Sequence, residues 1–379
     1  MWWRSARIWS NDRSCNKEGG RVDRRLAVAG NSSRRGQHVV TKRALALTFV
    51  MGLAGWPYVG RAAPPSIVAE DLMIESGDPG IRLFVRNKHP AGMSHFRSER
   101  TVLYVHGASQ ASECTFDLKV DQESWMDYIA RHGYDVYLVD LRGFGRSTKP
   151  PELAKPADDN PPMVRTAIAV RDVAAAVDSI LQRRRLSSLD LIGWSWGTAL
   201  MGQYASEHKD RVHRLVLYAP VWLHEPPNAA AAPLGAYRTW TMDGQRKVLQ
   251  TGAPESIRDV LLAPEVFAAW SACETGTDPE GAKQNSPAIR TPNGYYADDR
   301  DYQMAGKALW EPAEITAPTL VIVGDWDGVT PPARAEAVFS RLANAPERRL
   351  VQIGEATHVA LLERNRLQLY REVQMFLDE

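Results

Sequence analysis

Short apolar runs alternate with longer helical patterns along most of the chain after residue 66. Uninterrupted apolar runs of this length predict buried strands. They occur at Thr101–Val105, Tyr134–Asp140, Ser188–Gly193, Arg214–Tyr218, Thr319–Val323 and Arg349–Ile353. Ahead of them, Ile67–Ser76 and Ile81–Arg86 alternate apolar and polar residues around Gly77-Asp78-Pro79-Gly80, which predicts a hairpin.

Apolar residues recur at helical spacing between these strands. The predicted helices are one with apolar positions Trp125, Tyr128 and Ile129 that ends at Gly133, then Val164–Arg184, Thr198–His208, Ala333–Ala343 and Leu361–Leu377. Strands that alternate with helices of this kind predict an α/β fold with a mostly parallel central sheet and helices on both faces.

The alternation stops between Val221 and Ile315, where about 90 residues show no clear strand and many alanines and prolines. Helical patches lie around Tyr237–Leu249 and Ser256–Cys273. We interpret residues 223–314 as a helical cap inserted into a core made of residues 63–222 and 315–379.

The charge of the chain changes sharply near residue 62. Residues 1–62 hold 12 Lys/Arg and 3 Asp/Glu, whereas the rest of the chain has a net charge of −8. A mildly acidic body predicts no nucleic-acid surface. Lys42-Arg43 precedes the 13-residue apolar run Ala44–Trp56, and small residues before Ala63 suit a signal peptidase.

We therefore predict that residues 1–62 are a basic leader whose signal peptide, at about 40–62, is removed. The product would be periplasmic or secreted, without stable membrane insertion. An uncleaved anchor is the alternative, although the apolar run is shorter than the roughly 20 residues of a membrane span. Residues 1–38 show no period, and we expect them to precede the true start; a disordered extension or a twin-arginine-like leader is the alternative.

The strand Ser188–Gly193 leads into Gly193-Trp194-Ser195-Trp196-Gly197, which is followed by a predicted helix. A serine at a sharp strand-to-helix turn exposes its hydroxyl above the sheet, and glycines let the flanking chain pack closely. This context favours Ser195 as a nucleophile over an ordinary glycine-rich turn. The N–H of Trp196 would point at the same spot.

A serine nucleophile needs a base, which in this architecture is a histidine that follows an acid in the chain. His358 follows the last predicted strand, and Asp327 follows Thr319–Val323. Asp325 competes for the role of the acid, but it lies closer to the strand and we expect it to bond backbone amides.

An oxyanion hole needs two backbone N–H groups. Trp196 supplies one, and the loop after Thr101–Val105 supplies the other, for which Ala108 is the first candidate and Ser109 the second. His106 in this loop is expected to hydrogen-bond the loop backbone. The sequence has no HExxH or CxxC motif, and the chemistry needs no metal or cofactor, so neither is expected.

Taken in order, His106-Gly107, the Asp140–Ser147 segment, the Ser195 pentapeptide, Gly324–Asp327 and His358 resemble the cap-bearing α/β-hydrolase superfamily over residues 66–379. The resemblance implies that fold and a serine esterase-like member of it. It also implies a structural role for the Asp140–Ser147 loop. A serine at position 195 argues against epoxide hydrolases and haloalkane dehalogenases, which carry an aspartate there.

Aromatic residues of the elbow and the cap are within possible reach of a pocket: Trp194, Trp196, Trp240, Trp270, Trp310, Tyr295 and Tyr296. Substrate contacts are predicted for Trp194, Ser109 and Trp270. These residues favour a small-molecule carboxylic ester with a medium-sized apolar or aromatic group. The oligomeric state stays open.

Three other functions share these residues. A proline iminopeptidase-like enzyme needs acidic cap residues for the substrate amine, and Glu265, Glu274 and Glu280 are available. Carbon–carbon bond hydrolases of ring-cleavage products are normally cytoplasmic, which conflicts with a signal peptide. A non-catalytic ligand-binding protein on the same fold is the third.

Two cysteines lie in the body of the chain, Cys114 near the oxyanion loop and Cys273 in the cap; a third, Cys15, lies in the leader. In an exported protein, Cys114 and Cys273 could pair. Their bond would clip the cap to the core across 159 residues. Two separate buried thiols are the alternative.

Overall fold

The computed structural model describes residues 65–226 and 233–379. They belong to the second of two compact units, which begins at Ala62. The predictions for residues 1–62, including the signal peptide and the leader, lie outside the described residues. Within the two described ranges, no helix combines the length and the apolar composition that crossing a membrane requires.

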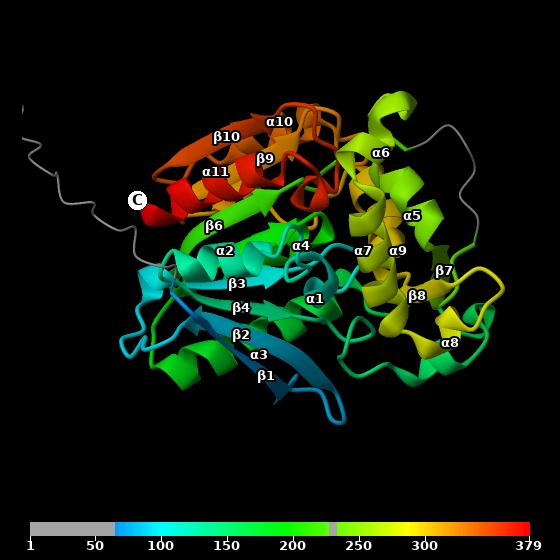
Figure 1. Cartoon of the computed structure of the whole chain (residues 1–379), viewed down its shortest axis with the longest axis horizontal. Helices are drawn as coiled ribbons and strands as arrows, with labels where there is room; N and C mark the ends of the chain where they lie inside the picture. The colour runs from blue at the N-terminus through cyan, green and yellow to red at the C-terminus, as the bar shows by residue number, and fades with distance from the viewer. Residues whose placement is uncertain (1–64, 227–232) are drawn as a thin grey trace, which may run out of the picture. The chain divides into compact units, whose positions relative to one another are not determined.

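The centre of this unit is a sheet of eight strands in the order β1-β2-β4-β3-β5-β6-β9-β10 (Figure 1). Strands β1 and β2 form an antiparallel hairpin, β2 pairs antiparallel with β4, and every other neighbouring pair is parallel. The strands are β1 (Ile67–Glu75), β2 (Arg82–Pro90), β3 (Thr101–Val105), β4 (Asp135–Val139), β5 (Leu189–Trp194), β6 (Val212–Tyr218), β9 (Thr319–Gly324) and β10 (Arg348–Ile353).

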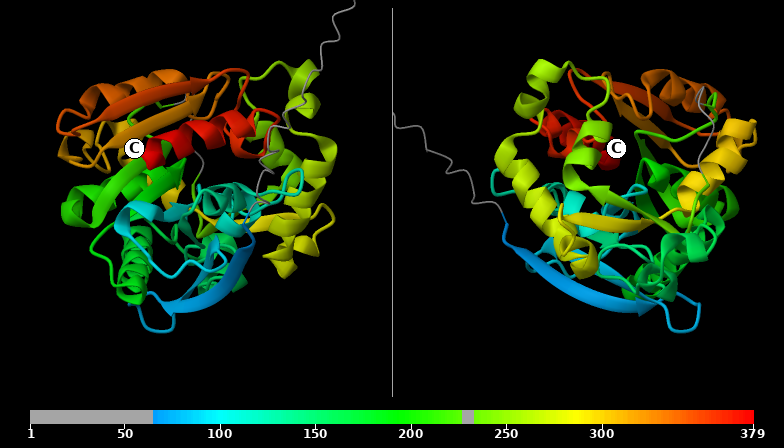
Figure 2. Two further views of the ribbon diagram at one scale, coloured as in Figure 1. Left: turned by 60° about the vertical axis from the view of Figure 1, so that its left-hand side comes forward. Right: turned by 90° about the vertical axis from the view of Figure 1, so that its right-hand side faces the viewer.

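Helices cover both faces of the sheet, as Figure 2 shows from two directions. The helices are α1 (Ser112–Thr115), α2 (Trp125–Arg131), α3 (Thr166–Arg184), α4 (Trp196–Glu207), α10 (Pro332–Arg341) and α11 (Arg366–Asp378). Apolar residues of α3, α4 and α10 form one buried cluster with one face, and those of α2 and α11 form a second cluster with the other. The central strands are buried on both sides, which explains their uninterrupted apolar runs.

The last predicted helix starts later than its apolar pattern indicates. A short 3₁₀ turn occupies Ala360–Leu362, and α11 begins only at Arg366. Between them Glu363 is extended, and its buried carboxylate accepts hydrogen bonds from the backbone N–H and the hydroxyl of Thr357. These bonds hold the chain in a turn after His358, so the apolar residues of 359–362 pack without belonging to the helix.

The segment between β6 and β9 lies at the edge of the sheet where the parallel strands end (Figure 1). We refer to residues 222–318 as the insertion. Its elements are β7 (Tyr237–Thr241), α5 (Met242–Leu249), α6 (Arg258–Leu261), α7 (Pro264–Gly276), α8 (Pro279–Ala282), β8 (Ala288–Pro292) and α9 (Gly294–Asp301).

The expectation that this region contains no strand is wrong. The start of the predicted helical patch Tyr237–Leu249 is strand β7, which pairs antiparallel with β8. Aromatic and β-branched residues suit an extended strand, and β7 reads Tyr-Arg-Thr-Trp-Thr. Thr241 then caps α5, because its side chain accepts a hydrogen bond from the N–H of Gly244.

A disulfide joins the core to the insertion. The bond links Cys114 in α1 to Cys273 in α7, whose Cα atoms are 5.5 Å apart. The structure therefore confirms the pairing hypothesis and excludes two separate thiols. It attaches α7 directly to the short helix that follows the predicted oxyanion loop.

Candidate functional site

Ser195 lies at the turn between β5 and α4, in a backbone conformation that non-glycine residues rarely adopt. Its φ is 55° and its ψ is −120°. The flanking glycines make this turn possible, because a Cβ at Gly193 would lie 2.4 Å from the carbonyl oxygen of Gly197. A Cβ at Gly197 would lie 2.5 Å from the carbonyl oxygen of Val105. Strain of this kind gathers at functional sites, and the turn presents the Ser195 side chain above the sheet.

His358 and Asp327 meet beside this turn. The imidazole Nδ1 of His358 lies 2.8 Å from Oδ2 of Asp327. Asp327 also accepts hydrogen bonds from the N–H groups of Val329 and Thr330 and from the Thr330 hydroxyl, at 2.8 to 2.9 Å. With Nδ1 donating to Asp327, Nε2 of His358 is left as the acceptor of the neutral ring.

Asp325, the competing acid, does not face the imidazole. Its Oδ1 accepts a hydrogen bond from the N–H of Ala356 at 3.3 Å. Asp325 therefore braces the loop that carries His358, and Asp327 is the acid beside the imidazole. Both aspartates follow β9, and only the direction of the turn decides which of them reaches His358.

The loop after β3 passes close to Ser195. A Cβ at Gly107 would lie 3.2 Å from the Ser195 Cβ and 3.6 Å from its Oγ, so a larger residue here would press against the Ser195 side chain. Ala108 lines the same cavity as Ser195. Trp196 is the first residue of α4, and its N–H has no acceptor within the helix.

His106 holds this loop in place through hydrogen bonds to the backbone. Its Nδ1 donates to the carbonyl of Gly107 at 2.6 Å, and its Nε2 accepts from the N–H of Leu141 at 3.1 Å. Burial lowers the pKa of His106, which favours the neutral ring that this pair of bonds requires. The residue therefore has the contacts that the sequence predicts.

A cavity of about 110 Å³ opens at Ser195. Its wall is mostly apolar and aromatic, with a polar side formed by a serine and two glutamines. Its lining residues are Ala108, Ser109, Gln110, Ser195, Trp240, Gln245, Val248, Leu249, Tyr295, Tyr296, Val329 and His358. Of the predicted substrate contacts, only Ser109 lies in this wall.

The prediction that Trp194 and Trp270 contact the substrate is wrong, because both indoles are fully buried away from the cavity. The N–H of Trp194 donates to the backbone carbonyl of His358 at 3.0 Å, as does the hydroxyl of Tyr218. Trp270 packs in the core and donates to Glu274. A buried indole N–H requires an acceptor, and these acceptors turn both rings inward.

The acidic residues required by an aminopeptidase are absent from the cavity wall. Glu265 and Glu280 are exposed, and none of the predicted carboxylates lines the cavity. Glu274 is buried and accepts hydrogen bonds from the N–H of Ala111 and from Trp270. Burial raises the pKa of Glu274 well above its usual range.

The Asp140–Ser147 loop braces the first turn of α1. Oδ1 of Asp140 accepts from the N–H of Ser112 at 2.8 Å, and Oδ2 accepts from the N–H of Arg146 at 3.0 Å. A Cβ at Gly145 would lie 1.8 Å from Oδ2 of Asp140. The loop thus has the backbone contacts of a structural element, as the family resemblance implies.

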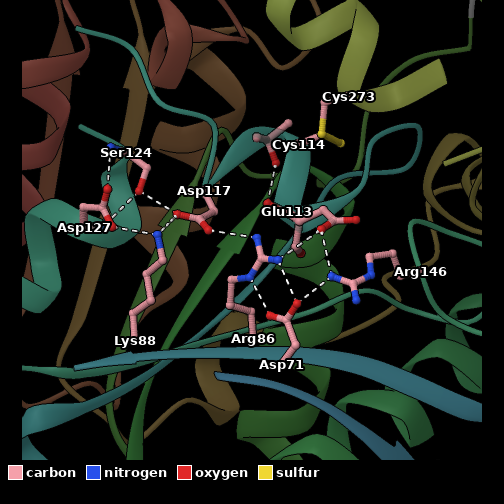
Figure 3. A network of polar contacts seen from close by, with 12 residues as sticks. Asp71, Arg86, Lys88, Glu113, Cys114, Asp117, Ser124, Asp127, Arg146 and Cys273 are labelled. Carbon is pink, nitrogen blue, oxygen red and sulfur yellow. Dashed lines mark hydrogen bonds and ion pairs between the residues drawn. A yellow bond between two sulfur atoms is a disulfide. The ribbon is translucent and has the colours of Figure 1, made fainter. Parts of the chain in front are cut away.

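A network of ion pairs anchors α1 and the residues after it to strand β2 (Figure 3). Lys88 lies between Asp117 and Asp127, at 2.7 Å from the latter, and Arg86 donates to Asp117 at 3.0 Å. Glu113 lies 3.6 Å from Arg86, and burial raises the pKa of its carboxyl to about 7. The segment that follows the predicted oxyanion loop is therefore held by ion pairs to β2 and by the disulfide to α7.

Several residues of the site were not found from the sequence. Six of them belong to no motif: Gln110, Gln245, Val248, Leu249, Val329 and Thr330. For Trp240, Tyr295 and Tyr296 the sequence indicates only aromatic residues within possible reach of a pocket. Val248 and Leu249 lie three and four residues after Gln245 on one helix, which is a usable signal because residues three and four apart share a face.

Comparisons with known proteins agree with this fold. Residues 100–365 match the family model described as alpha/beta hydrolase fold. A curated poly(3-hydroxyalkanoate) depolymerase from Ectopseudomonas oleovorans is 29% identical over 176 residues, which are 44% of this chain and 56% of that protein. The match thus spans little more than half of the relative's length.

Two solved structures have the same fold. An esterase from Thermogutta terrifontis is 19% identical with a TM-score of 0.54, covering 82% of this chain and 98% of its own. A 2-hydroxy-6-oxo-6-phenylhexa-2,4-dienoate hydrolase from Rhodococcus sp. strain RHA1 is 16% identical with a TM-score of 0.55, covering 83% and 100%. The family model covers well over half of the chain, and the chain therefore belongs to the α/β-hydrolase fold family.

Proposed function

We propose that this protein is a serine hydrolase that cleaves carboxylic esters through an acyl-enzyme. One observation carries the proposal: Ser195, on a strained turn, shares a cavity with His358, whose Nδ1 is held by Asp327. A strained serine beside an oriented imidazole matches the requirements of an activated nucleophile.

In the proposed reaction, Ser195 Oγ attacks the ester carbonyl carbon while its proton passes to Nε2 of His358. The N–H groups of Ala108 and Trp196 hold the negative oxygen of the tetrahedral intermediate. As the carbon–oxygen bond to the alcohol breaks, His358 returns the proton to the leaving alkoxide. Water, deprotonated by His358, then attacks the acyl-enzyme and releases the acid.

The wall of the cavity supports an apolar or aromatic group of medium size in the substrate. Trp240, Tyr295 and Tyr296 supply aromatic surface, and Val248 and Leu249 supply aliphatic surface. Among the described residues that line it there is no carboxylate, lysine or arginine, so this wall offers no negative charge to pair with a substrate ammonium group. The similarity to a depolymerase of polyesters also favours an ester over an amide.

The test is hydrolysis of p-nitrophenyl esters of increasing acyl length, together with amino-acid anilides, by the protein without its leader. We expect ester turnover and no comparable turnover of anilides. Faster cleavage of the anilides would favour the aminopeptidase function, and a failure to turn over either class would favour a non-catalytic ligand-binding protein. The Ser195→Ala protein is the control for spontaneous hydrolysis.

We also propose that the protein is periplasmic or secreted. The signal-like segment at about 40–62 supports this, and a disulfide between Cys114 and Cys273 suits an oxidising compartment. Expressed in a Gram-negative host, the protein should have a mature N-terminus near Ala63. Mass spectrometry that finds an intact chain from Met1 in the cytoplasm would contradict the proposal.

A further inference from the structure

The polar side of the cavity contains a glutamine that the proposed reaction does not use. Gln110 follows the oxyanion loop, is 2% exposed and lines the cavity together with Ser195. Its side chain contacts Ser109 and Gln245, which line the same cavity. A glutamine this deeply buried must place both ends of its amide group.

The hydrogen bonds determine which way this amide points. The carbonyl oxygen of Ser109 can only accept, so the Gln245 atom 3.0 Å from it is Nε2. Oε1 of Gln245 therefore faces Gln110, and the atom 3.0 Å from it must be the donor Nε2 of Gln110. The same nitrogen lies 2.8 Å from the Ser109 hydroxyl oxygen.

This arrangement leaves Oε1 of Gln110 next to Gly107, near the Ser195 side chain. No N–H or O–H group in the described part of the chain donates to it. Oε1 and the Ser195 Oγ lie 3.4 and 3.6 Å from the position that a Cβ would take at Gly107, so the two oxygens are at most about 7 Å apart. Oε1 is not one of the fully enclosed polar atoms that lack a partner among the described residues, so it can accept a hydrogen bond from a group that enters the cavity.

We infer that Gln110 is a specificity-determining residue whose Oε1 accepts a hydrogen bond from a hydroxyl or N–H group that the substrate carries close to its scissile carbonyl. The inference rests on the proposed ester hydrolysis at Ser195 and names the substrate class within it. A reacting carbonyl carbon lies about 3 Å from the serine oxygen, and a donor lies about 2.8 Å from Oε1. Because the Ser195 Oγ and the Gln110 Oε1 are so close together, the donor must be only a few bonds from the carbonyl carbon.

The test uses pairs of esters in which a methyl group removes the donor and little else changes. The first pair is p-nitrophenyl 3-hydroxybutyrate and 3-methoxybutyrate, and the second is p-nitrophenyl N-acetylglycinate and N-acetylsarcosinate. The third carries the donor on the alcohol: 2-hydroxyethyl and 2-methoxyethyl butyrate. The pairs distinguish a hydroxyl from an N–H donor and the acyl side from the alcohol side.

In at least one pair, we expect the wild-type protein to cleave the ester that carries the donor with a kcat/KM at least tenfold higher than that of its methylated partner. A site built for a hydrogen bond rejects analogues that lack it. Gln110→Met keeps the length of the side chain and removes the acceptor, and it should reduce this preference to less than threefold. Val248→Ala enlarges the same cavity without touching the acceptor and should keep the preference. If Gln110→Met does not fold, Gln110→Ala serves with the same expectation.

The inference is overturned if the wild-type protein shows no tenfold preference in any pair, or if the preference survives the loss of the Gln110 amide. In either case the methylated esters would still be cleaved in a Ser195-dependent reaction, and the proposed function would stand. If the wild-type protein cleaves no ester of the set, the proposed function itself fails and the inference fails with it.

Discussion

Replacing Ser195 or His358 by alanine should lower kcat/KM for p-nitrophenyl esters by several orders of magnitude, and the double variant should lose little more than either single one. Residues that act as one unit give such non-additive losses. Ser195 and His358 line one cavity, and Asp327 lies 2.8 Å from Nδ1 of His358. The measurement is the initial rate of each purified variant, from which the rate of spontaneous hydrolysis of the same ester in buffer is subtracted.

The two aspartates after β9 provide a matched pair for this experiment. Asp327→Asn places an amide next to Nδ1 of His358, which favours the wrong tautomer, and should cost on the order of 10⁴-fold in kcat. Asp325→Asn is the control, because within the described residues the Asp325 carboxylate accepts a hydrogen bond only from the backbone N–H of Ala356, and its effect should be mild. If Asp325→Asn abolished activity and Asp327→Asn left kcat nearly unchanged, the assignment of the acid would be reversed.

Loss of the Cys114–Cys273 disulfide should markedly lower the free energy of unfolding. The bond closes a loop of 159 residues. Restricting so long a loop in the unfolded chain is worth about 5 kcal/mol by the chain-entropy relation. Urea unfolding of the Cys114→Ala/Cys273→Ala variant measures the difference in free energy directly.

The reductant supplies the control for this prediction. Wild-type protein in reductant should unfold at the lower urea concentration of the double variant, whereas the double variant should be insensitive to reductant. Equal midpoints for oxidised and reduced wild-type protein would contradict the prediction. So would two free thiols in the denatured, unreduced body of the chain.

The sequence predicted the parts of the fold that depend on neighbouring residues. Buried strands carry uninterrupted apolar runs, and the strands predicted from residue 101 onward lie where those runs place them. Prediction failed where tertiary contacts override the local pattern. Tyr237–Thr241 is a strand because β8 lies beside it, and α11 starts late because Glu363 bonds back to Thr357.

The same division holds in the candidate site. Ser195 and His358 were predicted because a strained turn and a loop after the last strand have local signatures. Trp194 and Trp270 were predicted as substrate contacts because aromatic residues near an elbow suit a pocket. Their indole N–H groups instead bond His358 and Glu274 in the interior, and nothing in the spacing of the residues reveals such partners.

What the sequence alone determined is the order of the strands and helices of the core along the chain and the residue types available for chemistry, because both follow from periodicity and from short motifs. The tertiary structure decided which aspartate faces His358, which cysteines pair and which residues line the cavity. It also decided the direction of the Gln110 amide, through a carbonyl of Ser109 and a side chain of Gln245 that lies 135 residues away. Hydrogen bonds between such distant segments exist only once the insertion packs on the core, so no local pattern encodes them.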